Sequence, residues 1–192
     1  MPHHWNQTEI KFAYRAFSYH DSLLFPLTIL DDIVGAGISS RLNLSICEKM
    51  GLAYFVSSSL DCFSDDGSFD LDITVKKGDV VRGIKGIQNE VGKLLRHGVS
   101  EHELARAKER YICDLEKDKD SPARMGIRYG LWSMKGNSLS LDHEKQSVKQ
   151  ITVALMKNLI EKLFQPKNLN VAIVGAMTRG EEKEVRRLLG IR

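Results

Sequence analysis

The stretch GAGISSRLNLSICEKMGLAYFVSSS, residues 35–59, decides how this sequence is interpreted. Its opening glycines end a preceding segment of helical periodicity, and a serine after them can cap a second helix with leucine and isoleucine on one side. Gly51 ends that second helix, and an apolar run from Ala53 to about Leu60 has the composition of a strand. The stretch therefore predicts a helix, a tight turn and a strand in close succession.

Strand periodicity appears on both sides of this stretch. Ile10, Phe12 and Tyr14 alternate with polar or small residues, which is the period of a half-buried strand. The turn signal Asp65-Asp66-Gly67 is followed by a second alternating run over residues 69–75, with aspartates on its polar side. The strand at 53–60 and this run are expected to form a hairpin with one solvent-exposed face.

Helical periodicity occupies most of the remaining chain. Apolar spacings of three and four predict helices over residues 22–33, 80–94 and 152–164. Ser100 and Glu103 form a capping box that begins a further helix running towards Pro122. NLNVAIVGA supplies a last strand before a short charged C-terminal helix. The fold class expected is α+β, a two-layer sandwich in which helices cover one face of a mostly antiparallel mixed sheet.

Length and charge limit the classes of function. A chain of 192 residues with 42% hydrophobic and 28% charged residues is expected to form one domain over residues 1–192. Its 28 Lys and Arg against 25 Asp and Glu give a net charge of +3 without a long block of one sign. That excess is too small to predict a nucleic acid as partner.

The cysteines and the apolar runs indicate the cellular compartment in which the protein is expected. Cys47, Cys62 and Cys113 lack C-x-x-C spacing, so we expect reduced thiols that pack as small apolar residues. The N-terminal residues as given lack the apolar core of a signal peptide, and no apolar run has the length of a membrane span. These features favour a cytoplasmic location without fixing the compartment.

The histidines do not have the spacing of a zinc site. His97 and His102 are five residues apart, which would separate them by about 140° on one helix, and the capping box puts them on different helices. In HELAR an arginine, Arg106, stands where H-E-x-x-H needs its second histidine. His143-Glu144 lacks a second histidine in the same way. The sequence therefore predicts no metal ligands and no cofactor in this chain.

Other catalytic patterns are equally incomplete. No G-x-S-x-G elbow is present, so the scattered serines are interpreted as structural or exposed residues. GAGISS, residues 35–40, lacks both the lysine of a P-loop and the third glycine of a dinucleotide fingerprint. A turn between helices is the plainer interpretation of that segment.

Three segments carry a resemblance to a known family. They are Ser40-Arg41-Leu42 with Gly51-Leu52-Ala53-Tyr54 in the opening stretch, GVSEHELARAKERY at residues 98–111, and PKNLNVAIVG at residues 166–175. In order and distance they resemble the C-terminal half of the pitrilysin/insulinase-like zinc peptidases, which include the mitochondrial processing peptidases. The resemblance spans essentially the whole chain.

The resemblance implies a non-catalytic domain. Such peptidases have two similar α+β halves that close as a clamshell around a chamber. The N-terminal half holds zinc in an inverted H-x-x-E-H motif, whose glutamate activates a zinc-bound water. The C-terminal half holds no metal, lines the opposite wall and contacts the peptide substrate. The catalytic half is expected on the same polypeptide or on a partner subunit. A homodimer of this chain is a further expected arrangement.

The resemblance also assigns candidate substrate contacts. Active relatives use an arginine and a tyrosine seven residues apart; the tyrosine maps on Tyr54 and the arginine position on Cys47. A thiol offers one weak donor in place of a charged guanidinium. From the residues alone, Tyr54 can equally be a packing residue and Cys47 a small buried thiol. Arg41 is interpreted as a structural contact rather than a substrate ligand.

Two other classes of function stay open. The chain can belong to a scaffold subunit in which both halves have lost their chemistry, and the cysteine at position 47 favours this alternative. It can also be a binding module that takes up an extended peptide by strand addition at a sheet edge.

Overall fold

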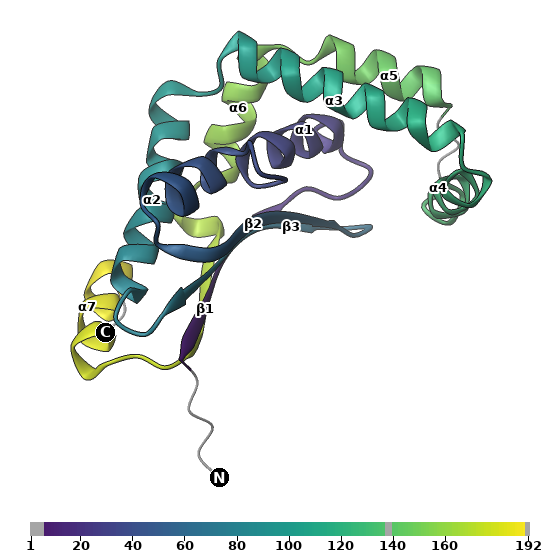
Figure 1. Ribbon diagram of the computed structural model, residues 1–192. Helices are drawn as coiled ribbons and strands as arrows, with labels where there is room; N and C mark the ends of the chain where they lie inside the picture. The colour runs from purple at the N-terminus through teal and green to yellow at the C-terminus, as the bar shows by residue number, and fades with distance from the viewer. Residues whose placement is uncertain (1–5, 137–139, 191–192) are drawn as a thin grey trace.

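The computed structural model describes residues 6–136 and 140–190, and Figure 1 shows a layer of helices on one side of a curved sheet. Residues 1–5, part of the segment in which we expect no signal peptide, lie outside the described residues. The sheet consists of β1 (Gln7–Ala16), β2 (Ala53–Cys62), β3 (Gly67–Lys76) and β4 (Leu169–Gly175).

The four strands lie in the order β2-β3-β1-β4. β1 is central and pairs antiparallel with both β3 and β4, so that Ile10 lies between Ile73 and Ile173. β2 and β3 form the predicted hairpin, and β2 is one edge of the sheet. The predicted α+β fold is confirmed, and the pairings within the described residues are antiparallel throughout rather than mixed.

Helices account for most of the rest of the described chain. They are α1 (Leu24–Val34), the π-helix η1 (Asn43–Lys49), α2 (Val80–His97), α3 (Glu101–Lys119), α4 (Pro122–Met134), α5 (Leu141–Gln150), α6 (Val153–Leu163), the 3₁₀ turn η2 (Pro166–Asn168) and α7 (Arg179–Leu189). The sequence did not predict α4 or α5, and it predicted an ordinary helix in place of η1. Among the described helices, none combines the length and apolar character needed to cross a membrane.

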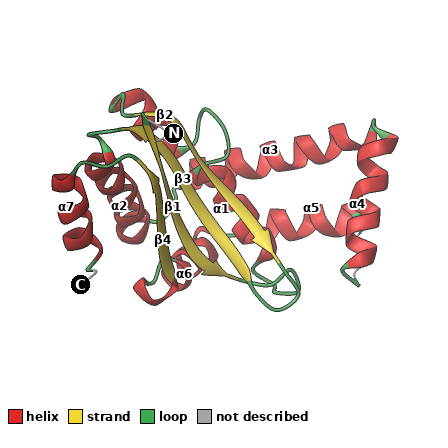
Figure 2. Cartoon of the chain, turned by 90° about the horizontal axis from the view of Figure 1, so that it is seen from below, coloured by secondary structure: helices red, strands yellow, loops and turns green. Residues whose placement is uncertain are grey.

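The core lies between the helices and one face of the sheet. Alternate strand residues such as Phe12 and Phe69 are fully buried there, and so are Ile84 and Ile87 of α2. Burying side chains of this size contributes roughly 1.5–3 kcal/mol each. Figure 2 views the opposite face of the sheet, which none of the described helices covers.

The caps of the helices agree with the sequence pattern. The Ser100 hydroxyl accepts a hydrogen bond from the Glu103 amide at 3.2 Å, and the Glu103 carboxylate accepts one from the Ser100 amide at 2.9 Å. A second capping box joins Thr178 and Glu181 at the start of α7. Glu181 also accepts a bond from the amide of Val80 at 3.0 Å, and this bond fixes α7 against the start of α2.

The end of α1 makes a close approach to β2 at Gly35. A methyl group added at Gly35 would lie 2.2 Å from the Ser58 amide nitrogen, well inside van der Waals contact. The Ser58 hydroxyl donates to the carboxylate of Asp31 on α1, and burial raises the pKa of that carboxyl group. Only glycine therefore fits where the helix meets the sheet.

All three cysteines are free thiols. Cys47 and Cys62 are half-buried and pack against the core, as the sequence predicts. The prediction is wrong for Cys113, which is exposed. Its helix, α3, buries few of its residues, so its surface reaches solvent along much of its length.

Candidate functional site

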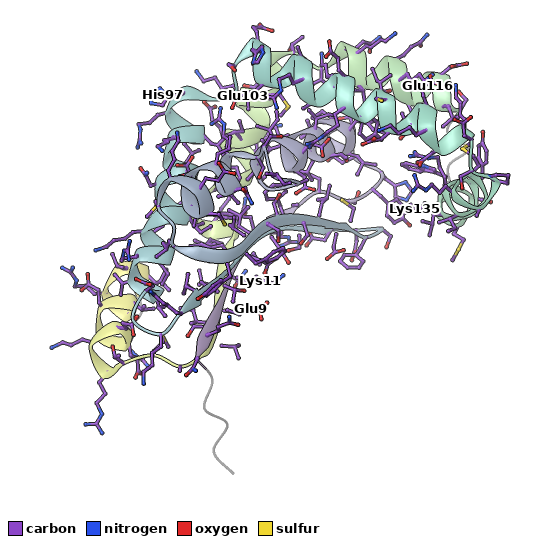
Figure 3. All side chains as sticks on the ribbon, in the orientation of Figure 1. Glu9, Lys11, His97, Glu103, Glu116 and Lys135 are labelled. Carbon is purple, nitrogen blue, oxygen red and sulfur yellow. The ribbon has the colours of Figure 1, made fainter. Side chains whose placement is uncertain are left out.

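The uncovered face of the sheet carries a charged cluster at its centre. Lys11 on β1 lies 2.9 Å from Asp70 and 3.0 Å from Asp72, both on β3. Figure 3 shows Lys11 and Glu9 on the side of the sheet away from the helices. Partial burial lowers the pKa of Lys11, but the hydrogen bonds that Lys11 donates to the two aspartates, together with their negative charge, outweigh this effect and raise that pKa. Two carboxylates around one ammonium leave this part of the face mildly acidic.

The sequence indicated which residues of β3 lie on this face, but not the residue of β1 that they contact. The aspartates alternate with buried apolar residues of β3, which marks the polar side of the strand. Lys11 comes from a strand 59 residues earlier than Asp70. No periodicity within one strand indicates which residue of another strand lies opposite it, so this contact was missed.

A β-bulge displaces Tyr54 at the start of β2. Ala53 lies opposite Val75 and Phe55 lies opposite Thr74, so Tyr54 is an extra residue without a partner on β3. Bulges re-aim side chains and are common at sheet edges and beside active sites. Tyr54 is 75% exposed and Phe55 58% exposed. Phe55 lies opposite Thr74 on the polar side of β3, so its side chain turns to the uncovered face, and Tyr54 lies next to it in the bulge, exposed to solvent.

Cys47 lies in the π-helix that precedes this bulge. π-helical turns are rare and occur frequently at functional sites. The Cys47 side chain is half-buried against the core, while Tyr54 is exposed. Burial raises the pKa of the Cys47 thiol, and the carboxylate of Glu48 raises it further. The thiol is therefore held in its neutral form and supplies no charge at the position where active relatives are expected to have arginine.

Arg41 makes a structural contact at the helix ends. Its Nε and one terminal nitrogen each donate to Glu103 at 2.7 Å, and the same terminal nitrogen donates to the carbonyl of Gly98 at 2.9 Å. Partial burial raises the pKa of Glu103. The hydrogen bonds that Arg41 and Ser100 donate to its carboxylate, with the charge of Arg41, outweigh this effect and lower that pKa to about 2. Figure 3 shows Glu103 in the helical layer, on the side of the molecule opposite Lys11.

A surface cavity of about 480 Å³ lies beside Arg41, lined by residues of α1 and α3. Arg41 and Arg110 both line it, and both are already ion-paired, with Glu103 and Asp32 respectively. The cavity therefore belongs to the helical layer and is separate from the uncovered sheet face.

The described residues do not fit a metal centre. Within the ranges 6–136 and 140–190, no group of three His, Cys, Asp or Glu side chains is placed to hold a metal ion. His97 is the last residue of α2 and His102 lies in α3, on separate helices as the sequence predicts.

A family profile described as peptidase M16 inactive domain matches residues 3–111. An uncharacterized zinc protease of Mycobacterium bovis is 29% identical over 176 residues, which cover 85% of this chain and 38% of the relative. One from Mycobacterium leprae is 28% identical over 78% of this chain and 34% of its own length. The chain thus spans little more than a third of these two relatives.

Solved structures share the fold. A peptidase M16 inactive domain from Pseudomonas fluorescens superposes with a TM-score of 0.80 at 21% identity, over 91% of this chain and 42% of that one. The inactive peptidase domain of a proposed zinc protease from Bordetella parapertussis gives a TM-score of 0.79 at 12% identity, over 93% of this chain and 98% of that one. At these identities the likeness establishes the architecture alone.

Proposed function

The chain belongs to the family of peptidase M16 inactive domains, and we propose from this that it is the non-catalytic C-terminal half of a zinc peptidase. In this proposal its uncovered sheet face forms a wall of the substrate chamber. The zinc-bearing half supplies the metal and the activated water, on the same polypeptide or on a partner subunit. A cytoplasmic location remains part of the proposal.

The observation that carries the proposal is the position of Tyr54. Tyr54 lies in the bulge at the start of the edge strand β2, next to Phe55 on the uncovered face, and is 75% exposed. An exposed phenol costs nothing to leave without a partner in the free domain, and it can donate a hydrogen bond to a peptide carbonyl. The neighbouring Phe55 adds apolar surface for a substrate side chain.

The chemistry assigned to this chain is limited to holding the substrate. Tyr54 would donate to the carbonyl oxygen as negative charge develops on it, and such a donor typically contributes a rate factor of about 10² to 10³. The cluster of Lys11, Asp70 and Asp72 carries a small negative excess and would favour a basic side chain of a peptide at this part of the wall. No step of bond cleavage is assigned to residues of this chain.

The test is reconstitution with the zinc-bearing half. We expect the protein that contains both halves to hydrolyse an unstructured peptide in a chelator-sensitive manner, and this chain alone to bind no stoichiometric zinc and to cleave nothing. Zinc and chelator-sensitive cleavage in a pure sample of this chain alone would contradict the proposal. So would a complete protein without the H-x-x-E-H motif.

Cys47 favours a second candidate, a scaffold or peptide-binding subunit without proteolytic activity. The thiol is neutral and half-buried, so the position lacks the charged donor expected of active relatives. β2 is an edge strand, and an extended peptide can pair with such an edge through its main chain. Peptide binding without turnover in the two-half protein would support this candidate over the first.

A further inference from the structure

Helix α4 turns an apolar stripe to solvent. Ile127, Leu131 and Met134 are spaced by four and three residues, which puts them on one side of the helix. Their exposed fractions are 64%, 52% and 85%, and no residue of α4 is buried. A contiguous apolar stripe of this kind on a folded chain marks an interaction surface.

Polar contacts on the inner side hold α4 in this orientation. Arg128 donates to both oxygens of Glu144 on α5, at 2.8 and 3.0 Å, and to Asp118 on α3 at 3.2 Å. The Tyr111 hydroxyl donates to the same Glu144, which is 1% exposed. Rotating α4 to bury its apolar stripe would break these bonds and leave the Glu144 carboxylate buried without its ion pair. The outward direction of the stripe is therefore specified by the domain itself.

The C-terminal end of α4 is anchored in the same direction. Lys135 lies 5.1 Å from the ring centroid of Tyr19 and 5.2 Å from that of Trp132. Figure 3 shows Lys135 directed from α4 back toward the rest of the domain. This contact is of the cation–π type, which contributes roughly 0.5–1 kcal/mol at exposed sites.

Two glycines beside the stripe weaken the helix. Gly126 and Gly130 lie in α4, and a methyl group added at either would meet nothing within 4 Å. Each glycine in a helix interior costs about 1 kcal/mol relative to alanine. A helix with two glycines and no buried residue gains little from its own sequence, and the glycines leave room for another backbone to approach closely.

We propose that this stripe, Ile127, Leu131 and Met134, is the surface on which the zinc-bearing half of the protein docks. The inference rests on the function proposed above. Most of the length of the two mycobacterial relatives lies outside the part that this chain matches, since the matched part covers 34% and 38% of them. A large body of chain is therefore available to cover the stripe, and the described residues leave it uncovered.

The position of α4 agrees with this occupant. Figures 1 and 2 both place α4 at the end of the molecule farthest from α7, beyond the β2–β3 hairpin. A body seated there meets α4 without blocking the uncovered sheet face. The stripe and the chamber wall are thus separate surfaces, and a change in one can be tested without changing the other.

The test is site-specific photo-crosslinking in the complete protein. A benzophenone amino acid replaces Leu131, and in a matched control it replaces Ile38, which is 78% exposed and lies between α1 and η1. We expect residue 131 to cross-link to peptides of the half that carries H-x-x-E-H, and residue 38 to give none of these products. Cross-links from residue 131 to a second copy of α4, or none to the zinc-bearing half, would overturn the inference.

A second variant set tests the energetics of the stripe. With the photo-reactive residue at 134, Ile127→Ser should reduce the yield of the inter-half product about tenfold, as for an interface anchor. Ile38→Ser is the control and should leave the yield unchanged. Equal yields in both variants would contradict docking through the stripe.

The outcomes separate the two proposals. If residue 131 cross-links elsewhere while the complete protein still hydrolyses peptide in a Tyr54-dependent manner, the docking surface is wrong and the proposed function stands. If the complete protein has no zinc-bearing half, both are wrong.

Discussion

The guanidinium of Arg41 holds the carboxylate of Glu103 through two hydrogen bonds of 2.7 Å, across 62 residues of sequence. The same carboxylate closes the capping box at the start of α3, and the same guanidinium donates to Gly98 just before it. The pair therefore joins the segment that leads into η1 to the start of α3. Arg41 thus uses its Nε and one terminal nitrogen for contacts within the domain.

Loss of this pair should destabilise the fold. Arg41→Ala leaves the half-buried Glu103 carboxylate without its partner, and we expect a loss of about 2 kcal/mol, less than for a fully buried pair. Urea unfolding of the purified protein measures it. Arg106→Ala, at an exposed position of α3, should change stability by no more than about 0.5 kcal/mol. A fall in peptide turnover at unchanged stability would instead make Arg41 a substrate contact.

The same pair predicts a dependence of stability on acid. The pKa of Glu103 is lowered from 4.5 to about 2, so the folded protein binds this proton less readily than the unfolded chain. The contribution of the ionised Glu103 carboxylate to the free energy of unfolding is fully present above pH 4.5 and is lost as pH falls to about 2. The difference in unfolding free energy between the wild type and Glu103→Gln should shrink across that range. A difference that stays constant with pH would contradict the assignment.

Tyr54→Phe removes the phenolic hydroxyl and keeps the ring. In the complete protein we expect kcat/KM for a peptide to fall by about 10², as for loss of one donor to a developing oxyanion. Stability should not change, because the side chain is exposed. Tyr19→Phe is the matched control and should leave turnover unchanged. Equal activity of wild type and Tyr54→Phe would remove Tyr54 from the site.

Cys47→Arg should raise peptide turnover. The substitution restores a permanent charge and fixed donors at a position whose thiol is neutral, and a gain of about tenfold is expected. Cys47→Ala is the control, because it removes the thiol without adding charge and should leave turnover unchanged. Circular dichroism checks that both variants fold. A folded Cys47→Arg protein with unaltered turnover would mean that this position takes no part in catalysis.

Gly35→Ala should be strongly destabilising. Its methyl group would lie 2.2 Å from the Ser58 nitrogen, so α1 and β2 would have to separate, at a cost of about 2 kcal/mol or more. Gly126→Ala is the matched control, since its methyl group meets open space in a helix and should stabilise by up to about 1 kcal/mol. Thermal unfolding of both variants gives the comparison. Similar shifts of Tm in the two variants would refute the close approach.

Local patterns in the sequence predicted the elements that bury an apolar stripe. The hairpin, α2 and the capping box at Ser100 follow from periodicity and turn chemistry within short windows. α4 was missed because Pro122 was interpreted as the end of a helix rather than as the first residue of the next one. Ile127, Leu131 and Met134 do have helical spacing, so the periodicity of α4 was present in the sequence and was overlooked.

The candidate site was predictable only in part. Tyr54 was chosen from a resemblance, and nothing in the residues around it predicts the bulge that exposes it. The partners of Lys11 and Arg41 lie 59 to 62 residues away, and these distances are closed by the fold as a whole. The sequence predicted an ordinary helix around Cys47, and the structure has a π-helical turn there.

The bulge at Tyr54 also sets which insertions and deletions β2 can accept during evolution. Side chains alternate along a strand, so one residue added or lost between Val56 and Cys62 would move core residues to the wet face and polar residues to the core. The bulge already holds one residue more than its partner strand requires. Length variation among homologues should therefore concentrate at residues 53–55, where a deletion removes the tyrosine and leaves the rest of the strand in register.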